Sequence, residues 1–189
     1  VIYMVFLYVT WLPAYLQQER GLSIAESGWV LMIPFLGGTL GQLTSGYAAD
    51  KLLARGFGPI NSRKLPICIG LVFAAAFTVP AAYTPNLTMA ILCLTLAMYF
   101  VNLASGGSWA LVSVAAPRRL VASLGSVMNF GGYLAGAAAP LITGIVVDKT
   151  GSFVNALLIS ACVALAGAFA YILIVKAPIA DPVKAPDAL

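Results

Sequence analysis

The sequence contains no histidine, and charged residues make up only 8% of its 189 positions. The three cysteines, Cys68, Cys93 and Cys162, lie inside apolar runs, where a thiol ordinarily behaves as a small hydrophobic side chain. Neither a disulfide framework nor a metal site is indicated, and no cofactor is expected. Since most acid–base and nucleophilic schemes need histidine or a buried acid, we predict that the protein is not an enzyme.

Charge is also too scattered to suggest a nucleic-acid partner. Lys and Arg outnumber Asp and Glu by 10 to 6, which gives a net charge of +4, but these residues stand in short loops rather than along one face. Hydrophobic residues reach 61%, compared with about 45–50% in ordinary soluble domains. The sequence therefore predicts an integral membrane protein surrounded by a lipid bilayer.

Six apolar segments can be marked, and each approaches or exceeds the roughly 20 residues with which a helix crosses the hydrocarbon core. They cover residues 1–17, 27–49, 65–83, 87–116, 120–147 and 153–175. Alternating strand patterns are absent, which favours an all-α membrane bundle over residues 1–177. The first segment is the shortest and starts without Met, so we expect a fragment. The proline-containing segment 178–189 is expected to be a disordered cytoplasmic tail.

Basic residues indicate the orientation of the bundle. Eight of the ten follow the second, fourth or sixth segment: Lys51, Arg55, Arg63, Lys64, Arg118, Arg119, Lys176 and Lys184. By the positive-inside rule this side is cytoplasmic, and both ends of the chain lie there.

A short signature occurs twice, at an offset of 98 residues. Thr10-Trp11 corresponds to Ser108-Trp109, and Gly46, Asp50 and Lys51 correspond to Gly144, Asp148 and Lys149. Each copy covers three segments, and this odd number inverts the second copy relative to the first. The pattern predicts a 3+3 inverted repeat, the unit from which many transporters are built.

The uncharged polar residues fall at similar depths. Trp109 precedes Arg118 by nine residues and Asn129 follows Arg119 by ten, so at about 1.5 Å per residue both lie some 14 Å from one surface. Thr10 and Trp11 lie equally far from the opposite surface, before Arg20. We therefore expect these four residues to meet near the bilayer midplane.

Further polar residues surround this layer: Gln42, Asn102, Ser105 and Ser108. A buried amide costs several kcal/mol unless it finds a partner, so these side chains bind either a ligand or neighbouring helices. For Gln42 and Asn102 we favour interhelical packing. For Asn129 we favour a ligand, because Gly131 and Gly132 open space beside it. Gly106-Gly107 is expected to interrupt its helix and to place Trp109 on a cavity wall.

Several motifs together resemble one family. They are Thr-Trp-Leu-Pro-Ala-Tyr-Leu at 10–16, Gly46-x-x-x-Asp50-Lys51, Gly125-x-x-x-Asn129-x-x-Gly132 leading to Pro140 and Gly144, and Asp148-x-Thr-Gly-Ser-Phe at 148–153. They are similar to those of the anion:cation symporter family, a major facilitator branch with bacterial hexuronate, galactonate, tartrate and phthalate transporters. The resemblance covers residues 1–177 as spans seven to twelve of a twelve-helix fold.

The resemblance implies uptake of a small organic anion, such as a sugar acid, across the bacterial inner membrane with a coupling proton or Na⁺. It implies that the arginine that binds the substrate carboxylate, and the acids that carry the coupling proton, belong to a missing N-terminal six-helix half. Trp109 and Asn129 match positions that contact sugar-acid substrates. Some sugar-acid transporters of this family carry a hydroxyl side chain where this chain has Gly106. A less hydroxylated or an aromatic acid is therefore an alternative substrate.

The segment 46–56 also resembles the loop signature that latches one conformation in this superfamily. Gly46, Asp50, Lys51 and Arg55 are the latch candidates, with a solvated loop cluster as the alternative.

Other functional classes remain as alternatives to a transporter. A six-span scaffold would use every polar residue for packing, and a channel would pass ions without coupling. A membrane enzyme is disfavoured because Gly106-Gly107-Ser108 has no histidine to activate its serine.

Overall fold

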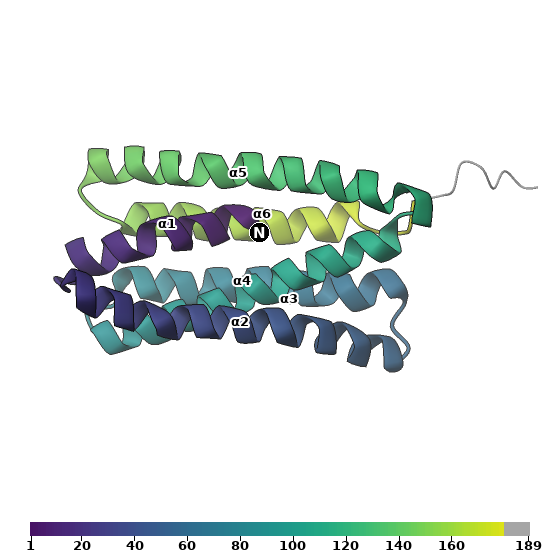
Figure 1. The fold of residues 1–189 in the computed structure, drawn as a ribbon, viewed down its shortest axis with the longest axis horizontal. Helices are drawn as coiled ribbons and strands as arrows, with labels where there is room; N and C mark the ends of the chain where they lie inside the picture. The colour runs from purple at the N-terminus through teal and green to yellow at the C-terminus, as the bar shows by residue number, and fades with distance from the viewer. Residues whose placement is uncertain (180–189) are drawn as a thin grey trace, which may run out of the picture.

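The computed structural model describes residues 1–179, and these fold into six α-helices joined by short loops, with no strand in this range (Figure 1). The helices are α1 (Ile2–Gln18), α2 (Ile24–Ala54), α3 (Pro59–Tyr83), α4 (Leu87–Ala115), α5 (Val121–Thr150) and α6 (Val154–Ile174). A 3₁₀ turn at Arg118–Leu120 precedes α5. The prediction of an all-α bundle is confirmed.

Five of the helices, α2 to α6, are long and apolar enough to cross a membrane, and α1 has 17 residues. Helices α2, α3 and α5 extend beyond the apolar segments of the sequence. Helix α2 starts before residue 27 because Ser23 caps it, accepting the Glu26 N–H at 3.2 Å while the Glu26 carboxylate accepts the Ser23 N–H at 2.9 Å. Hydropathy thus marks the hydrocarbon layer, and capping residues mark the helix ends.

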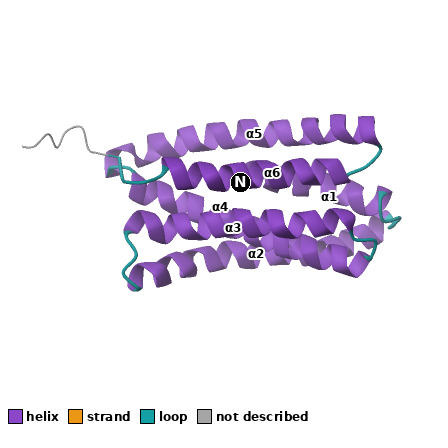
Figure 2. Cartoon of the chain, turned by 180° about the vertical axis from the view of Figure 1, so that it is seen from behind, coloured by secondary structure: helices purple, strands orange, loops and turns teal. Residues whose placement is uncertain are grey.

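The helices run nearly along a common axis, with α2 and α5 at opposite edges of the bundle (Figures 1 and 2). Between these edges, α3 packs against α4 and α6, α4 packs against α2, and α1 packs against α5. The two edge helices expose many large apolar side chains, among them Trp29 and Leu43 on α2 and Phe130 and Leu141 on α5. Apolar faces of this extent require lipid or another protein surface.

Glycines allow α2 to approach α4 closely. A Cβ added to Gly37 would lie 2.7 Å from Thr95 Cγ2, and one added to Gly41 would overlap the Tyr99 carbonyl. Asn102 of α4 lies against Gly38 and donates its amide to the Met98 carbonyl at 2.9 Å. The packing interpretation of Asn102 therefore agrees with its contacts, because small residues let neighbouring backbones and polar side chains meet.

The expected interruption at Gly106-Gly107 is wrong, because α4 is continuous through both residues. A Cβ at Gly106 would lie 2.7 Å from Ser45 Cβ of α2, and one at Gly107 would lie 2.8 Å from Ile67 Cγ1 of α3. The two glycines therefore allow α4 to fit between two helices rather than weakening it. A hydroxyl side chain at position 106 would meet Ser45 unless α2 and α4 moved apart.

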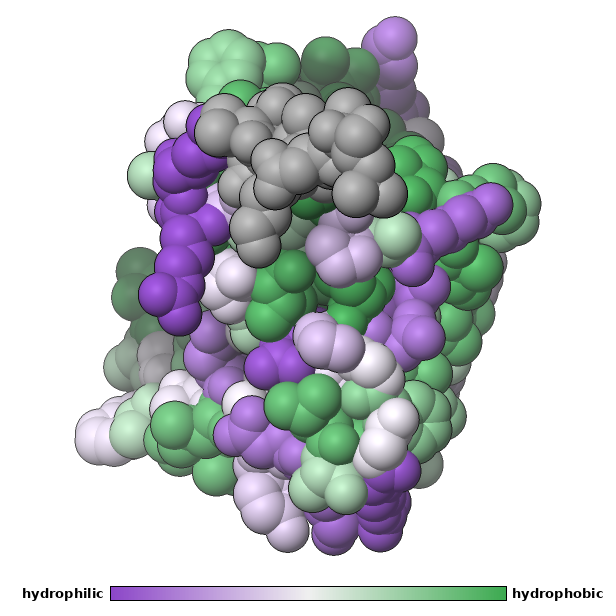
Figure 3. Space-filling model, turned by 90° about the vertical axis from the view of Figure 1, so that its right-hand side faces the viewer, coloured by the Kyte–Doolittle hydropathy of each residue, from purple (hydrophilic) through white to green (hydrophobic). Residues whose placement is uncertain are grey.

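The two ends of the bundle differ in charge. Seven of the described basic residues lie at one end, on which Figure 3 shows hydrophilic side chains among apolar ones: Lys51, Arg55, Arg63, Lys64, Arg118, Arg119 and Lys176. Arg20 and Lys149 lie at the other end. Lys184 and most of the predicted tail, residues 180–189, lie outside the described residues. Ile179 donates its N–H to the Ala115 carbonyl at 2.7 Å.

At the less basic end, two adjacent residues after α1, Glu19 and Arg20, form hydrogen bonds with the ends of two other helices. The Glu19 carboxylate accepts the Phe153 N–H at 2.8 Å, at the start of α6. Arg20 donates to the Thr84 carbonyl at 2.7 Å, at the end of α3, and to the Tyr15 hydroxyl. Each charge suits the helix end that it meets, since helix N-termini attract anions and C-termini attract cations.

Candidate functional site

A cleft of about 290 Å³ lies between α4, α5, α6 and the beginning of α1. Its polar side chains come from four helices: Tyr3, Ser105, Ser108, Trp109, Asn129 and Tyr171. The remaining lining is apolar or glycine, including Met128 and Gly132. None of the side chains that line the cleft, all within the described part of the chain, is charged. The cleft can therefore offer hydrogen bonds and apolar contact to a ligand, but no countercharge.

The structure brings together four of the seven predicted substrate-contact residues. Ser105, Ser108 and Trp109 follow one another on α4, and Asn129 faces them from α5. Trp109 is 46% exposed, so the indole forms an open wall rather than part of the core. Gly132 lies one turn from Asn129 in the same lining, as expected if small residues open space beside the amide.

Ser108 and Tyr171 form a hydrogen-bonded pair in the cleft. Ser108 donates its hydroxyl to the Ala104 carbonyl at 2.9 Å and accepts the Tyr171 hydroxyl at 3.1 Å. Because a serine has a single hydroxyl proton, Ser108 has none left for a ligand, and it is 93% buried, with 7% of its surface exposed. The oxygen of Tyr171 can still accept a hydrogen bond.

Sequence reasoning missed both tyrosines of the cleft. Tyr171 stands among apolar residues of the last segment, and only its hydrogen bond to a helix 63 positions away reveals its place. Tyr3 lies near the start of the sequence, and its buried hydroxyl has no partner within the described structure. The depth argument applied to Trp109 would not have selected Tyr171, which precedes Lys176 by five residues and so lies about 8 Å from the basic end by the same count.

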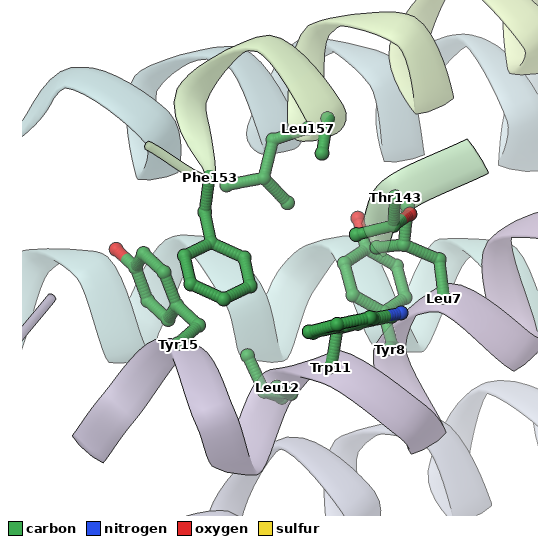
Figure 4. A pocket seen from close by; sticks show the side chains of 9 residues that line it. Leu7, Tyr8, Trp11, Leu12, Tyr15, Thr143, Phe153 and Leu157 are labelled. Atoms are coloured by element: carbon green, nitrogen blue, oxygen red, sulfur yellow. The ribbon is translucent and has the colours of Figure 1, made fainter. Parts of the chain in front are cut away.

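Trp11 lies away from this cleft, in a small apolar pocket between α1, α5 and α6 (Figure 4). The indole Nε1 donates to the Pro140 carbonyl at 3.2 Å, and the ring packs against Phe153 with centroids 5.8 Å apart. A Cβ at Gly144 would lie 3.4 Å from the ring, so glycine leaves room for it. The predicted convergence of Trp11 and Trp109 in one site is therefore wrong within this chain.

Thr10 and Gln42 also lie outside the cleft, exposed on α1 and α2. The candidate latch residues Gly46, Asp50, Lys51 and Arg55 are exposed at the basic end of α2 and just beyond it. The Lys51 ammonium lies 5.5 Å from the centre of the Tyr47 ring. Within residues 1–179, no ion pair joins Asp50 to Lys51 or Arg55, so a latch would need a partner from elsewhere.

Comparison with known sequences places these features in a family. The model of the Major Facilitator Superfamily matches residues 1–188. The chain belongs to this superfamily. It is 42% identical over 182 residues to the "Probable L-galactonate transporter" of Escherichia coli K12, a match that covers 96% of this chain and 40% of that protein. It is 40% identical over 168 residues to the D-galactonate transporter of Escherichia coli O6:H1, covering 89% and 38% respectively.

More distant relatives carry related names. The hexuronate transporter of Bacillus subtilis is 31% identical over 183 residues, covering 95% of this chain and 43% of that protein. The resemblance to major facilitator anion transporters is thus confirmed, and the chain is a multi-pass membrane protein. It spans about two fifths of the length of these relatives, a share consistent with one half of a transporter. Because these relatives are named transporters, the prediction that the chain is not an enzyme is also confirmed.

Proposed function

We propose that this chain forms the C-terminal six-helix half of a secondary transporter that takes up a small organic anion, such as a sugar acid. The observation that carries this proposal is the uncharged polar cleft with Trp109 on α4 and Asn129 on α5, in a chain similar to galactonate and hexuronate transporters. Transport proceeds by alternating access around a site between two halves, with a proton or Na⁺ as the coupling ion.

Residue roles follow from the chemistry of the cleft. The Asn129 amide both donates and accepts hydrogen bonds, which suits hydroxyl and carboxylate oxygens. Trp109 packs its ring against the carbon skeleton of the substrate, and Ser105 offers a further hydroxyl on the same helix. Thr10, Trp11 and Gln42 are not assigned substrate contacts, since they lie outside the cleft.

An anion in this cleft needs a positive charge, and the described side chains that line the cleft supply none. A cation and the residues that carry the coupling proton must therefore come from an N-terminal six-helix half, which is the expected partner. The exposed apolar edges formed by α2 and α5 offer surface on which such a half can pack.

The proposed location is the bacterial inner membrane, with the basic end of the bundle in the cytoplasm. Seven of the nine described Lys and Arg residues lie at this end, as the positive-inside rule requires. Val1 lines the cleft midway along the bundle rather than lying at the cytoplasmic end (Figure 1), and Arg20 then lies on the outer side.

At the cytoplasmic end, Asp50 serves as a conformational latch, with Gly46, Lys51 and Arg55 as the other residues of the signature. Its exposed carboxylate is available to the other half of the transporter. Replacing Asp50 with Asn should shift the balance between inward-open and outward-open forms, measured by accessibility of cysteines on either side. Unchanged uptake together with an unchanged balance would exclude the latch.

The binding site is tested by Trp109→Ala and Asn129→Ala in a transporter that contains both halves. Each variant should lower kcat/KM for sugar-acid uptake about 5- to 150-fold, since each removes a contact worth about 1–3 kcal/mol. Asn155→Ala is the matched control, because Asn155 is exposed on α6 and lies outside the cleft. Transport that survives both cleft substitutions would refute the assignment.

Water access separates this proposal from a scaffold. Cysteines placed at 109 and 129, after Cys68, Cys93 and Cys162 are replaced, should react with small thiol reagents if they line a wet cleft. Inert thiols would favour a dry packed bundle. A channel would instead show flux that neither saturates nor depends on a coupling ion.

A further inference from the structure

A second cavity, of about 260 Å³, lies on the outside of the bundle at its basic end, between α3 and α6. It shares no lining residue with the substrate cleft. Its lining combines two polar side chains with four that are apolar or weakly polar: Asn61 and Lys64, then Phe57, Leu65, Cys68 and Ile172.

The polar part of this groove is built around the Lys64 ammonium. Lys64 is half-buried and donates to the Val175 carbonyl at 2.9 Å, just after the last turn of α6. An ammonium has three N–H donors, so two remain for a ligand. Asn61 lies one turn earlier on α3 and adds an amide at the same level. Together, Lys64 and Asn61 form a positively charged, hydrogen-bonding end of the groove.

The groove becomes apolar as it runs along α3 away from the basic end. Asn61, Lys64, Leu65 and Cys68 follow the i, i+3, i+4, i+7 spacing of one helix face. At about 1.5 Å per residue, this face carries the groove about 10 Å into the apolar layer. Ile172, 52% exposed on α6, forms the opposite wall.

Charge complementarity identifies the occupant. This end of the bundle carries seven basic residues and, among residues 1–179, a single acid, Asp50. A soluble anion such as inorganic phosphate would leave the apolar two thirds of the lining unused, and a neutral lipid would leave the Lys64 donors unused. Basic pockets between membrane helices are suited to anionic lipid headgroups.

We propose that the α3/α6 groove binds one anionic phospholipid, whose phosphate accepts hydrogen bonds from Lys64 and Asn61. The first part of one acyl chain lies along Leu65, Cys68 and Ile172. The lipid thereby joins the end of α6 to the beginning of α3, next to the existing bond between Lys64 and Val175.

The proposal is tested with the full chain purified in a neutral detergent and titrated with phosphatidylglycerol, then examined by native mass spectrometry. One tightly bound phosphatidylglycerol should remain under conditions that remove phosphatidylcholine. Lys64→Gln should weaken binding about tenfold, as expected for loss of a charge-assisted hydrogen bond. Lys51→Gln, which removes the same charge from an exposed position at the same end, should leave binding unchanged.

One further variant and one competition experiment complete the test. Ile172→Trp keeps every charge but fills the apolar wall, and it should also weaken binding; this variant decides the question if Lys64→Gln does not fold. Inorganic phosphate at millimolar concentration should not displace the lipid. Equal effects of the Lys64 and Lys51 substitutions, no effect of Ile172→Trp, or displacement by inorganic phosphate would each overturn the proposal.

Discussion

The contact between α2 and α4 offers a sharp test of the packing, through the single substitution Gly41→Ala. The added methyl group would overlap the carbonyl oxygen of Tyr99 and lie 2.8 Å from its carbonyl carbon, compared with about 3.5–4.0 Å for carbon atoms in contact. Because both partners are backbone atoms within helices, no rotamer change relieves the overlap. The two helices must therefore separate by about 1 Å along their tightest contact.

Two opposing effects set the magnitude. Alanine is favoured over glycine inside a helix by about 1 kcal/mol. Overpacking costs about 1–3 kcal/mol, and an overlap with backbone belongs at the upper end of that range. We therefore expect Gly41→Ala to lower the free energy of unfolding by about 2 kcal/mol, despite the gain in helix propensity.

Thermal unfolding in detergent, followed by circular dichroism, measures the effect. Gly46→Ala is the matched control, because Gly46 lies on the same helix and has no atom within 4 Å of an added Cβ. This control should be as stable as the parent chain or more stable. If Gly41→Ala matched the stability of Gly46→Ala, the close approach of α2 to α4 would be refuted.

Other substitutions test single contacts. Arg20→Lys should destabilise the chain by about 1–2 kcal/mol in the same assay, since lysine lacks the planar fork that serves several acceptors at once. Thr143→Val should stabilise it, because the buried Thr143 hydroxyl has no partner, whereas Thr78→Val, whose hydroxyl bonds to α1, should destabilise it. Tyr171→Phe should raise KM for a polyhydroxylated acid about fivefold without affecting a hydroxyl-free acid, and Tyr83→Phe should change neither.

Counting residues from the loop charges predicted that Trp109 and Asn129 share a level along the bundle, but it failed for Trp11. Counting residues from the loop charges placed Trp109 and Asn129 at one level, and both line the cleft. The same counting placed Trp11 at that level, yet its indole bonds to Pro140, which lies eleven residues, or about 16 Å, beyond Asn129 along α5. Helices of about 30 residues, such as α5, are about 45 Å long and exceed the hydrocarbon core, so residues counted from opposite loops do not meet at one level.

The all-α class was predictable because long apolar runs leave helices as the supported choice for crossing a bilayer. Local propensity misled at Gly106-Gly107, where glycine normally weakens a helix. There, contacts with Ser45 and Ile67 show that the absence of side chains permits a three-helix junction. Helix propensity describes an isolated helix, whereas the close packing of neighbouring helices explains why glycine stands at these two positions.

Under the proposed function, the uncharged lining of the cleft leaves recognition of the substrate's charge to the other half of the transporter. If the charge of the substrate is bound elsewhere, this half distinguishes substrates by ring shape and hydroxyl pattern alone. Changes at Ser105, Trp109, Asn129 or Tyr171 would then alter which acid is accepted while leaving the net charge moved per cycle unchanged. New substrate preferences could evolve here without disturbing the energy source of transport.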